Sequence, residues 1–214
     1  KSASRIVGES LRQRKNNLQN STSLETQPLI IYESTVYPGA TREVCVPIIE
    51  EASGLIANND FFYGYSPERV NPGDKNKKLN SIVKVTSGST ELAGKWIDEL
   101  YKQIILAGTY KTKSVEIAEA AKIIENVQRD INIALVNELA RIFPALDVDV
   151  EDVLSAAATK WNFHRYTPGV GVGGHCIPVD PYYMIQRAAD VGVPAGLITA
   201  ARAVNRSMPS HVAG

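Results

Sequence analysis

The sequence predicts an α/β fold, in which strands at the edge of a larger parallel sheet are followed by an all-α domain built on one long helix. In the first half, short apolar runs alternate with helical patterns, which is typical of a parallel sheet covered by helices. In the second half, the stretch from Val115 to Ile142 contains no Gly or Pro and keeps a helical pattern throughout. We therefore expect two domains, residues 1–113 and residues 114–214.

Short apolar runs mark the strands, because strands buried on both faces of a sheet are apolar along their whole length. Strands are expected over residues 29–32, 61–65 and 81–86. Helices are expected over residues 4–18, 40–52 and 88–105, the first of them amphipathic at most. Pro47 is expected to kink the second helix, and Gly54 to end it.

The first strand runs into a Ser/Thr-rich turn, residues 33–39, which precedes a helix. A turn of this kind favours an anion or a phosphate group at the start of the helix. An ordinary helix cap by Ser34 or Thr35 fits the same residues equally well. The turn alone does not decide between the two.

The long helix carries polar residues on one side. Lys122, Asn126 and Arg129 fall at i, i+4 and i+7, so they share a face, and Glu119 lies near it. Solvated polar stripes are common, but Asn is unfavourable inside a helix, which favours a face that lines a site. Pro144 is expected to end this helix. Shorter helices are expected over residues 150–158, 182–189 and 196–206.

Residues 167–183 are dense in Gly and Pro, which predicts a loop with special backbone geometry rather than a helix or strand. Three of its glycines match G-x-G-x-x-G, namely Gly169, Gly171 and Gly174. A dinucleotide-binding loop needs a strand before this pattern and a helix opening inside it, and prolines on both sides argue against that context. The glycines are therefore expected to shape a pocket.

Cys176 is the side chain that this loop is expected to hold. Its neighbours His175 and Asp180 are polar, which favours a reactive thiol over a buried, inert one.

Composition argues against several classes of protein. The 214 residues carry 23 basic and 23 acidic side chains with no long run of either sign, which argues against a nucleic-acid or membrane-surface stripe. No apolar run approaches the roughly 20 residues that a membrane span needs. Two cysteines far apart in the sequence are typical of reduced thiols. We expect a cytoplasmic protein that binds no nucleic acid, no membrane and no metal.

Three blocks together resemble the nucleotide-sugar dehydrogenases, the UDP-glucose/GDP-mannose dehydrogenase family, which oxidise UDP-sugars to uronic acids with NAD. The blocks are Glu33-Ser-Thr-Val-Tyr-Pro-Gly39, Ser66-Pro-Glu-Arg-Val-Asn-Pro-Gly73 and Gly173-Gly-His-Cys-Ile-Pro-Val-Asp180. The resemblance covers nearly the whole chain. The lead-in over residues 159–163 looks most like the branch acting on UDP-N-acetylhexosamines, and it leaves the GlcNAc, GalNAc and ManNAc epimers open.

The resemblance implies a role for each matched residue. Cys176 matches the nucleophile, and Lys122 and Asp180 match residues that transfer protons and position water. Asn126 matches a residue that orients the sugar and the oxyanion, and Glu68 a carboxylate of the hydrolytic step. The remaining matches are substrate contacts at Arg69, Arg129 and Gly173 and an NAD contact at Thr35.

The implied reaction is a four-electron oxidation of the sugar C6 alcohol through a thiohemiacetal and a thioester on Cys176, in a homodimer built on the long helix, for polysaccharide biosynthesis. The resemblance implies that residues 1–113 hold the last strands of a Rossmann-type, NAD-binding parallel sheet, and that residues 114–214 form the central helical domain for catalysis and dimerisation. It also implies parts of the enzyme before and after these residues, so we expect an internal portion that is inactive alone. Two rivals stay open. One is a two-electron dehydrogenase of the 6-phosphogluconate or hydroxyacid type, which needs no cysteine, and the other is a non-catalytic helical dimerisation module.

Overall fold

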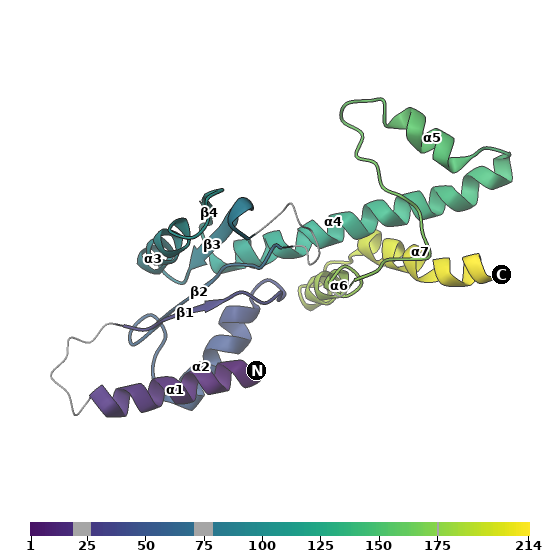
Figure 1. Cartoon of the computed structure of the whole chain (residues 1–214). Helices are drawn as coiled ribbons and strands as arrows, with labels where there is room; N and C mark the ends of the chain where they lie inside the picture. The colour runs from purple at the N-terminus through teal and green to yellow at the C-terminus, as the bar shows by residue number, and fades with distance from the viewer. Residues whose placement is uncertain (19–26, 71–78, 175) are drawn as a thin grey trace. The chain divides into compact units, whose positions relative to one another are not determined.

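The computed structural model describes residues 1–18, 27–70, 79–174 and 176–214. Their contacts divide the chain into two compact units, residues 1–122 and residues 123–214, and the division falls inside the longest helix (Figure 1). The predicted domain boundary before residue 114 stays a prediction.

The first unit is built on a four-stranded sheet with the order β1-β2-β3-β4. The strands are β1 (Leu29–Tyr32), β2 (Phe62–Tyr65), β3 (Lys84–Gly88) and β4 (Thr109–Lys111). The first three confirm the predicted strands to within a few residues. The fourth was not predicted, because it is three residues long and largely exposed and so carries no apolar run.

The sheet is mixed rather than parallel throughout. β1 pairs in parallel with β2, and β3 with β4, but β2 and β3 are antiparallel. A parallel pair needs a crossover, usually a helix. Between β2 and β3, the described residues hold only a 3₁₀ turn, Leu79–Ser81. The expectation of a parallel sheet is therefore wrong at this one pair.

Helices cover this sheet. They are α1 (Ser2–Leu18), α2 (Val46–Ser53) and α3 (Glu91–Lys102), and α1 and α2 lie side by side (Figure 1). A π-helix, Thr41–Cys45, precedes α2. The π-helix runs into α2 without a break, because Cys45 and Val46 at the junction are both right-handed helical, so residues 40–53 form one helical stretch that contains Pro47. The helical pitch changes directly before Pro47, at the place where the kink was predicted. Gly54 ends α2 with φ +67°, as predicted.

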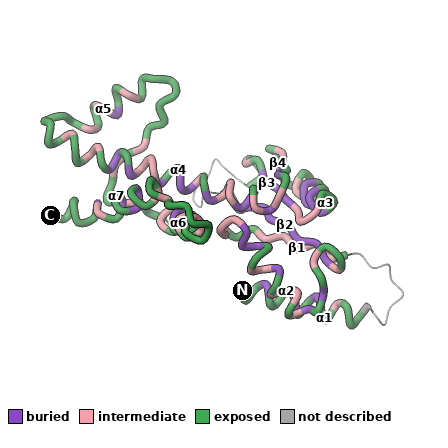
Figure 2. The backbone as a smooth tube through the Cα atoms, turned by 180° about the vertical axis from the view of Figure 1, so that it is seen from behind, coloured by how far each residue is buried: buried purple, intermediate pink, exposed green. Residues whose placement is uncertain are grey.

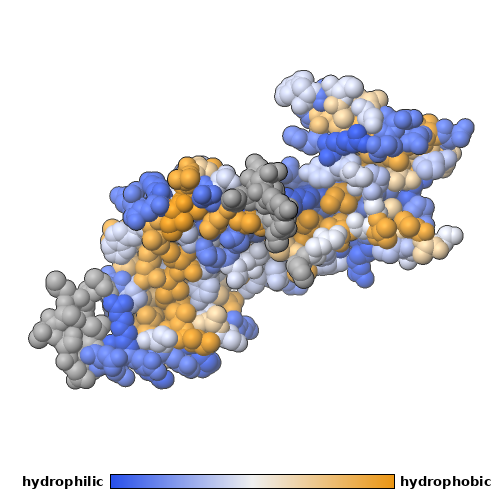
Figure 3. All heavy atoms as spheres, in the orientation of Figure 1, coloured by the Kyte–Doolittle hydropathy of each residue, from blue (hydrophilic) through white to orange (hydrophobic). Residues whose placement is uncertain are grey.

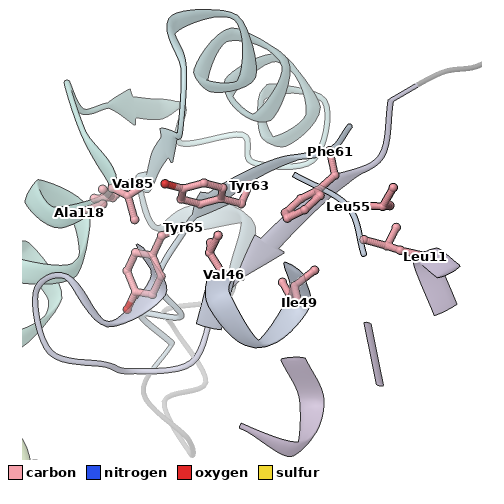
Figure 4. Packing of buried hydrophobic residues seen from close by; sticks show 10 residues of the cluster. Leu11, Val46, Ile49, Leu55, Phe61, Tyr63, Tyr65, Val85 and Ala118 are labelled. Atoms are coloured by element: carbon pink, nitrogen blue, oxygen red, sulfur yellow. The ribbon is translucent and has the colours of Figure 1, made fainter. Parts of the chain in front are cut away.

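The hydrophobic core of the first unit lies between the sheet and α2. Ile49, Phe61 and Tyr65 are fully buried in it, and Val46 and Val85 pack with them (Figure 4). Figure 2 shows β2 and β3 as buried segments, whereas hydrophilic side chains follow the outer edge of α1 in Figure 3. Burying side chains of this size stabilises the fold by about 1.5–3 kcal/mol each.

The second unit is helical in its described residues. Its helices are the greater part of α4 (Val115–Ile142), then α5 (Val150–Ala157), α6 (Asp180–Asp190) and α7 (Gly196–Ala213). The bounds of α4 agree with the prediction, and Pro144 follows its end in a 3₁₀ turn. Within the described ranges, no helix has the length and apolar character needed to cross a membrane.

Candidate active site

Cys176 lies in an irregular segment that leads into α6. Its side chain is exposed, so the alternative of a buried thiol is wrong. Its carbonyl accepts the N–H groups of Val179 at 3.0 Å and Asp180 at 2.8 Å, which fixes the backbone of the cysteine to the first turn of α6. His175, its predicted polar neighbour, lies outside the described residues.

The structure brings two of the predicted site residues into direct contact. The Asn126 side-chain amide, from α4, donates to Asp180 Oδ2 at 2.6 Å, and both side chains are buried. Burial of a carboxylate is unfavourable unless donors meet it, so the amide holds the Asp180 side chain in one place. The pair therefore presents an oriented carboxylate one helical turn after Cys176.

The other end of the loop is also attached to α4. The Gly169 N–H donates to Asn137 Oδ1 at 2.8 Å. Two residues later Gly171 has φ +137°, and a Cβ there would lie 3.2 Å from the Asn205 carbonyl oxygen of α7. Only glycine combines this backbone conformation with this close approach. A Cβ at Gly173 would meet nothing within 4 Å, so the backbone there faces open space.

α4 buries polar residues among apolar ones such as Ile123 and Val127, and they differ from the predicted stripe. The buried polar residues are Glu119, Asn126, Asp130 and Asn137, at i, i+7, i+11 and i+18. Of the predicted face only Asn126 is buried; Lys122 is half-buried and Arg129 is exposed. The sequence analysis missed Asp130 and Asn137. Their heptad-like spacing behind Asn126 was the signal that could have found them.

Two residues of α7 complete a buried polar network with this face. Arg202 Nη1 lies 2.5 Å from Asp130 Oδ1. The Asn205 amide donates to Asp130 Oδ1 at 2.8 Å and to the Asp130 carbonyl at 3.0 Å. The Asn137 amide in turn donates to Asn205 Oδ1 at 2.9 Å. We call Asp130, Asn137, Arg202 and Asn205 the α4–α7 network.

In the first unit, the turn after β1 is held by a carboxylate. Glu119 accepts the N–H of Gly39 at 2.6 Å and that of Thr41 at 2.9 Å. Burial raises the pKa of Glu119, although these hydrogen bonds lower it in part. The predicted cap by Ser34 or Thr35 is wrong, because no side chain of either residue caps this helix. Glu119 accepts two of the N–H groups there, which argues against a phosphate at the start of this helix.

A second carboxylate at the same turn is paired. Glu33 Oε1 lies 2.9 Å from the buried Lys84 ammonium and 2.6 Å from the Tyr101 hydroxyl, which donates to it. Burial raises the pKa of Glu33, but the bonds from Tyr101 and Lys84 outweigh it, so this pKa lies below its usual range. Thr35 follows, half-buried, at the carboxyl end of β1. Ligands of open α/β sheets bind at that edge.

Glu68 and Arg69 both contact backbone groups of the first unit. Glu68 is exposed and accepts the Val70 N–H at 2.6 Å. Arg69 donates to the Val83 carbonyl at 2.8 Å. Among the described residues, no three His, Cys, Asp or Glu side chains gather as metal ligands.

Two domain families match the chain. Residues 14–105 match the NAD binding domain of the UDP-glucose/GDP-mannose dehydrogenase family, and residues 116–207 match the central domain of the same family. Together the two matches cover most of the sequence.

Individual relatives agree with these matches. A protein named UDP-N-acetyl-D-glucosamine 6-dehydrogenase from Pseudomonas aeruginosa is 57% identical over 189 residues, and one of the same name from Salmonella typhi is 56% identical over 191 residues. These alignments cover 88% and 89% of this chain but only 44% and 45% of those proteins. The solved structure of the UDP-D-ManNAc dehydrogenase from Pyrococcus horikoshii aligns with a TM-score of 0.80 at 35% identity, covering 96% of this chain and 47% of that one.

Proposed function

This chain belongs to the UDP-glucose/GDP-mannose dehydrogenase family, and we propose that it serves the NAD-dependent four-electron oxidation of the C6 alcohol of a UDP-N-acetylhexosamine to the uronic acid. The observation that carries the proposal is the exposed Cys176 held next to the buried Asn126–Asp180 pair. A simple alcohol dehydrogenase needs no such thiol. The alignments cover only 44% and 45% of the two UDP-N-acetyl-D-glucosamine 6-dehydrogenases, which supports a working enzyme of about twice the length of this chain.

The thiol of Cys176 provides a covalent route by which the aldehyde is oxidised to the acid. The first oxidation removes a hydride from C6 and a proton from its hydroxyl, leaving an aldehyde. The Cys176 sulfur then bonds to the aldehyde carbon while the carbonyl oxygen takes a proton, which gives a thiohemiacetal. Loss of a second hydride from that carbon and of the hydroxyl proton gives a thioester. Water attacks it, the C–S bond breaks, and the acid leaves as the thiol regains its proton.

The other matched residues act on protons and charge. We assign Lys122 and Asp180 to proton transfer and the positioning of water, and Asn126 to the orientation of the sugar oxygen. Asn126 also keeps Asp180 oriented through their 2.6 Å hydrogen bond. Glu68 is assigned to the hydrolytic step. Substrate contacts are assigned to Arg69, Arg129 and Gly173.

NAD, when bound, accepts the hydride of both oxidations. Thr35 is the residue of this chain that we assign to it, because its hydroxyl lies at the carboxyl end of β1. The start of the following helix is not assigned to a phosphate, because Glu119 takes its N–H groups.

The experiment that tests this function counts the NADH formed per sugar consumed by the longest polypeptide that the gene encodes. Two NADH per sugar are expected for the four-electron route. One NADH would favour a two-electron dehydrogenase, and the roles of Cys176 and Glu68 would fall. UDP-GlcNAc is the first substrate to test, since two relatives at 56% and 57% identity are named for it, with UDP-ManNAc and UDP-GalNAc run in parallel.

We also propose that the protein is a homodimer through α4. Four large apolar residues of this helix are exposed although they share one face, at i, i+7, i+18 and i+25; they are Ile117, Ile124, Leu135 and Ile142. This stripe lies opposite the buried polar face. An isologous helix pair about a twofold axis covers such a stripe with an identical one.

Light scattering tests the dimer. Ile124→Lys combined with Leu135→Lys is expected to give a monomer, because charge at the centre of an apolar interface is unfavourable. Ile6→Lys is the matched control, since Ile6 is an exposed isoleucine on α1. A double variant that keeps the mass of the parent protein contradicts the proposed interface.

A further inference from the structure

We propose that the α4–α7 network is a positioning device that fixes both ends of the loop carrying Cys176. This inference rests on the proposed function, because it places these four residues behind the nucleophile of that reaction. None of them is assigned a contact with substrate or cofactor. Their effect is transmitted through the backbone of the loop.

The entry of the loop is attached to the network directly. Asn137 accepts the Gly169 N–H through Oδ1 and donates to Asn205 through its amide group, so one side chain joins the loop to α7. Gly171 then passes against the Asn205 carbonyl, where no Cβ fits without displacing the backbone. The orientation of Asn137 is thus set by Asn205, and that of Asn205 by Asp130.

The exit of the loop is attached through Arg202. Its guanidinium is paired with Asp130 and lies 5.5 Å from the centre of the Tyr182 ring, in the first turns of α6. A hydrogen bond from Arg202 lowers the pKa of Tyr182. Because α6 begins at Asp180, whose N–H binds the Cys176 carbonyl, this contact bears on the cysteine itself. One charged pair therefore connects with both ends of the loop.

The composition of the network argues for positioning rather than for stability alone. Asp130 Oδ2 and Arg202 Nε are buried and have no hydrogen-bond partner among the described residues. Buried ion pairs with unsatisfied atoms are poor sources of stability, and apolar residues of similar volume often replace them without loss. Side chains with fixed hydrogen-bond directions, by contrast, give the loop one defined path.

Release of the loop is expected to slow the second oxidation. The thiol has to reach the aldehyde carbon before the aldehyde leaves, and a displacement of about 1 Å at a reacting group lowers a rate by about 100-fold. An aldehyde that leaves early also lowers the yield of NADH per sugar below two. A merely structural residue changes the fraction of folded enzyme but not this ratio.

Asn137→Leu is the main variant, tested in the longest gene product. We expect kcat for acid formation to fall by about 100-fold with a smaller change in KM, and NADH per sugar to fall below two. Asn137→Asp keeps an acceptor for the Gly169 N–H and is expected to recover part of the rate. Asn132→Leu is the control, because Asn132 lies on the same helix and its amide donates to the Gln128 carbonyl within that helix.

If Asn137→Leu does not fold, Gly171→Ala provides a second test of the same proposal. It displaces the loop from α7 without altering a buried side chain, and the same loss of NADH stoichiometry is expected. Gly196→Ala is its control, since a Cβ there meets nothing within 4 Å. A ratio of two NADH in both Asn137→Leu and Gly171→Ala overturns the positioning role. A ratio of two in Cys176→Ser instead overturns the proposed function.

Discussion

The two loops that carry the proposed site are held by different chemistry. The turn after β1 is held by carboxylates: Glu119 accepts two of its N–H groups, and Glu33 is paired with Lys84 and Tyr101. The cysteine loop is held mainly by amides, since Asn137 accepts the N–H at its entry and Asn126 binds Asp180 at its exit.

This difference predicts which of the two anchors responds to pH. A carboxylate that anchors a backbone changes its charge, and with it the strength of the anchor, when it takes up a proton. A side-chain amide has no charge to change in the ordinary pH range. We therefore expect the Asn137 anchor at the entry of the cysteine loop to depend less on pH than the Glu119 anchor of the turn after β1.

The largest expected effect concerns the thiol itself. Cys176→Ser removes the nucleophile, and we expect uronic acid formation to fall by at least about 1000-fold, as in other enzymes that lose a covalent nucleophile. Cys45→Ser is the control, because Cys45 is the other free cysteine and lies in the π-helix before α2. If Cys176→Ser and Cys45→Ser lower the rate of acid formation equally, Cys176 is not the nucleophile. Rates of acid formation, measured by chromatography, decide between them.

The next effect tests the amide anchors by making one ionisable. Asn126→Asp places a second carboxylate beside Asp180 in a buried site, and we expect a loss of about 3 kcal/mol in the free energy of unfolding at neutral pH. One pKa of such a pair is raised in the folded state. Its stabilising contribution is therefore present in acid and lost as the pH rises through that pKa.

Urea unfolding of Asn126→Asp from pH 4 to pH 8 measures this loss. Asn132→Asp is the matched control, since Asn132 is a partly exposed residue of the same helix. Equal and pH-independent losses in both variants would contradict the contact between Asn126 and Asp180.

Glu119→Gln tests the carboxylate anchor. An amide can accept only one of the two N–H groups well, so we expect a loss of about 2 kcal/mol in the free energy of unfolding. Because burial raises the pKa of Glu119 in the folded state, its contribution is full below the unfolded pKa of about 4.3 and is lost as the pH rises through the raised value. The difference between the two proteins should be largest in acid.

Calorimetry or urea titration of both proteins over that pH range checks the sign. If the two stability curves run parallel, or if the difference grows as the pH rises, Glu119 does not titrate as the structure requires.

The smallest effects lie at helix caps and should be equal in the two units. Thr90 caps α3 by accepting the Ala93 N–H, and Asp149 caps α5 by accepting those of Glu151 and Asp152. Thr90→Ala and Asp149→Ala are each expected to lower the free energy of unfolding by about 1 kcal/mol and to leave the NADH stoichiometry unchanged. Denaturation midpoints measure the change in the free energy of unfolding. A changed number of NADH per sugar would show that these helix caps affect the proposed site.

Local patterns predicted much of the fold. The bounds of α4, the stop at Gly54 and the irregular segment around Cys176 all follow from residue type and spacing. The antiparallel pairing of β2 with β3 could not be predicted, because strand direction depends on the connection and not on the apolar run. β4 lacked any apolar signal.

Candidate site residues could be named from the sequence only where one residue type carries the chemistry. The Gly- and Pro-rich loop pointed to Cys176 and Asp180, and their catalytic roles stay predictions. Glu119 was placed near the polar face of α4 but not recognised as an anchor, and Asp130 was missed, because helical periodicity groups residues by face and does not say what faces them. Their partners are a turn after β1 and a helix of the C-terminal segment, far away in sequence.

The measurement that tests the central claim most directly is mass spectrometry of the enzyme stopped during turnover. The longest gene product is mixed with UDP-GlcNAc and NAD, quenched in acid within a turnover and digested. The account predicts a sugar-nucleotide adduct on the peptide that contains Cys176, removed by hydroxylamine as a thioester is. An enzyme that forms acid while its Cys176 peptide stays unmodified and freely alkylated throughout would contradict it.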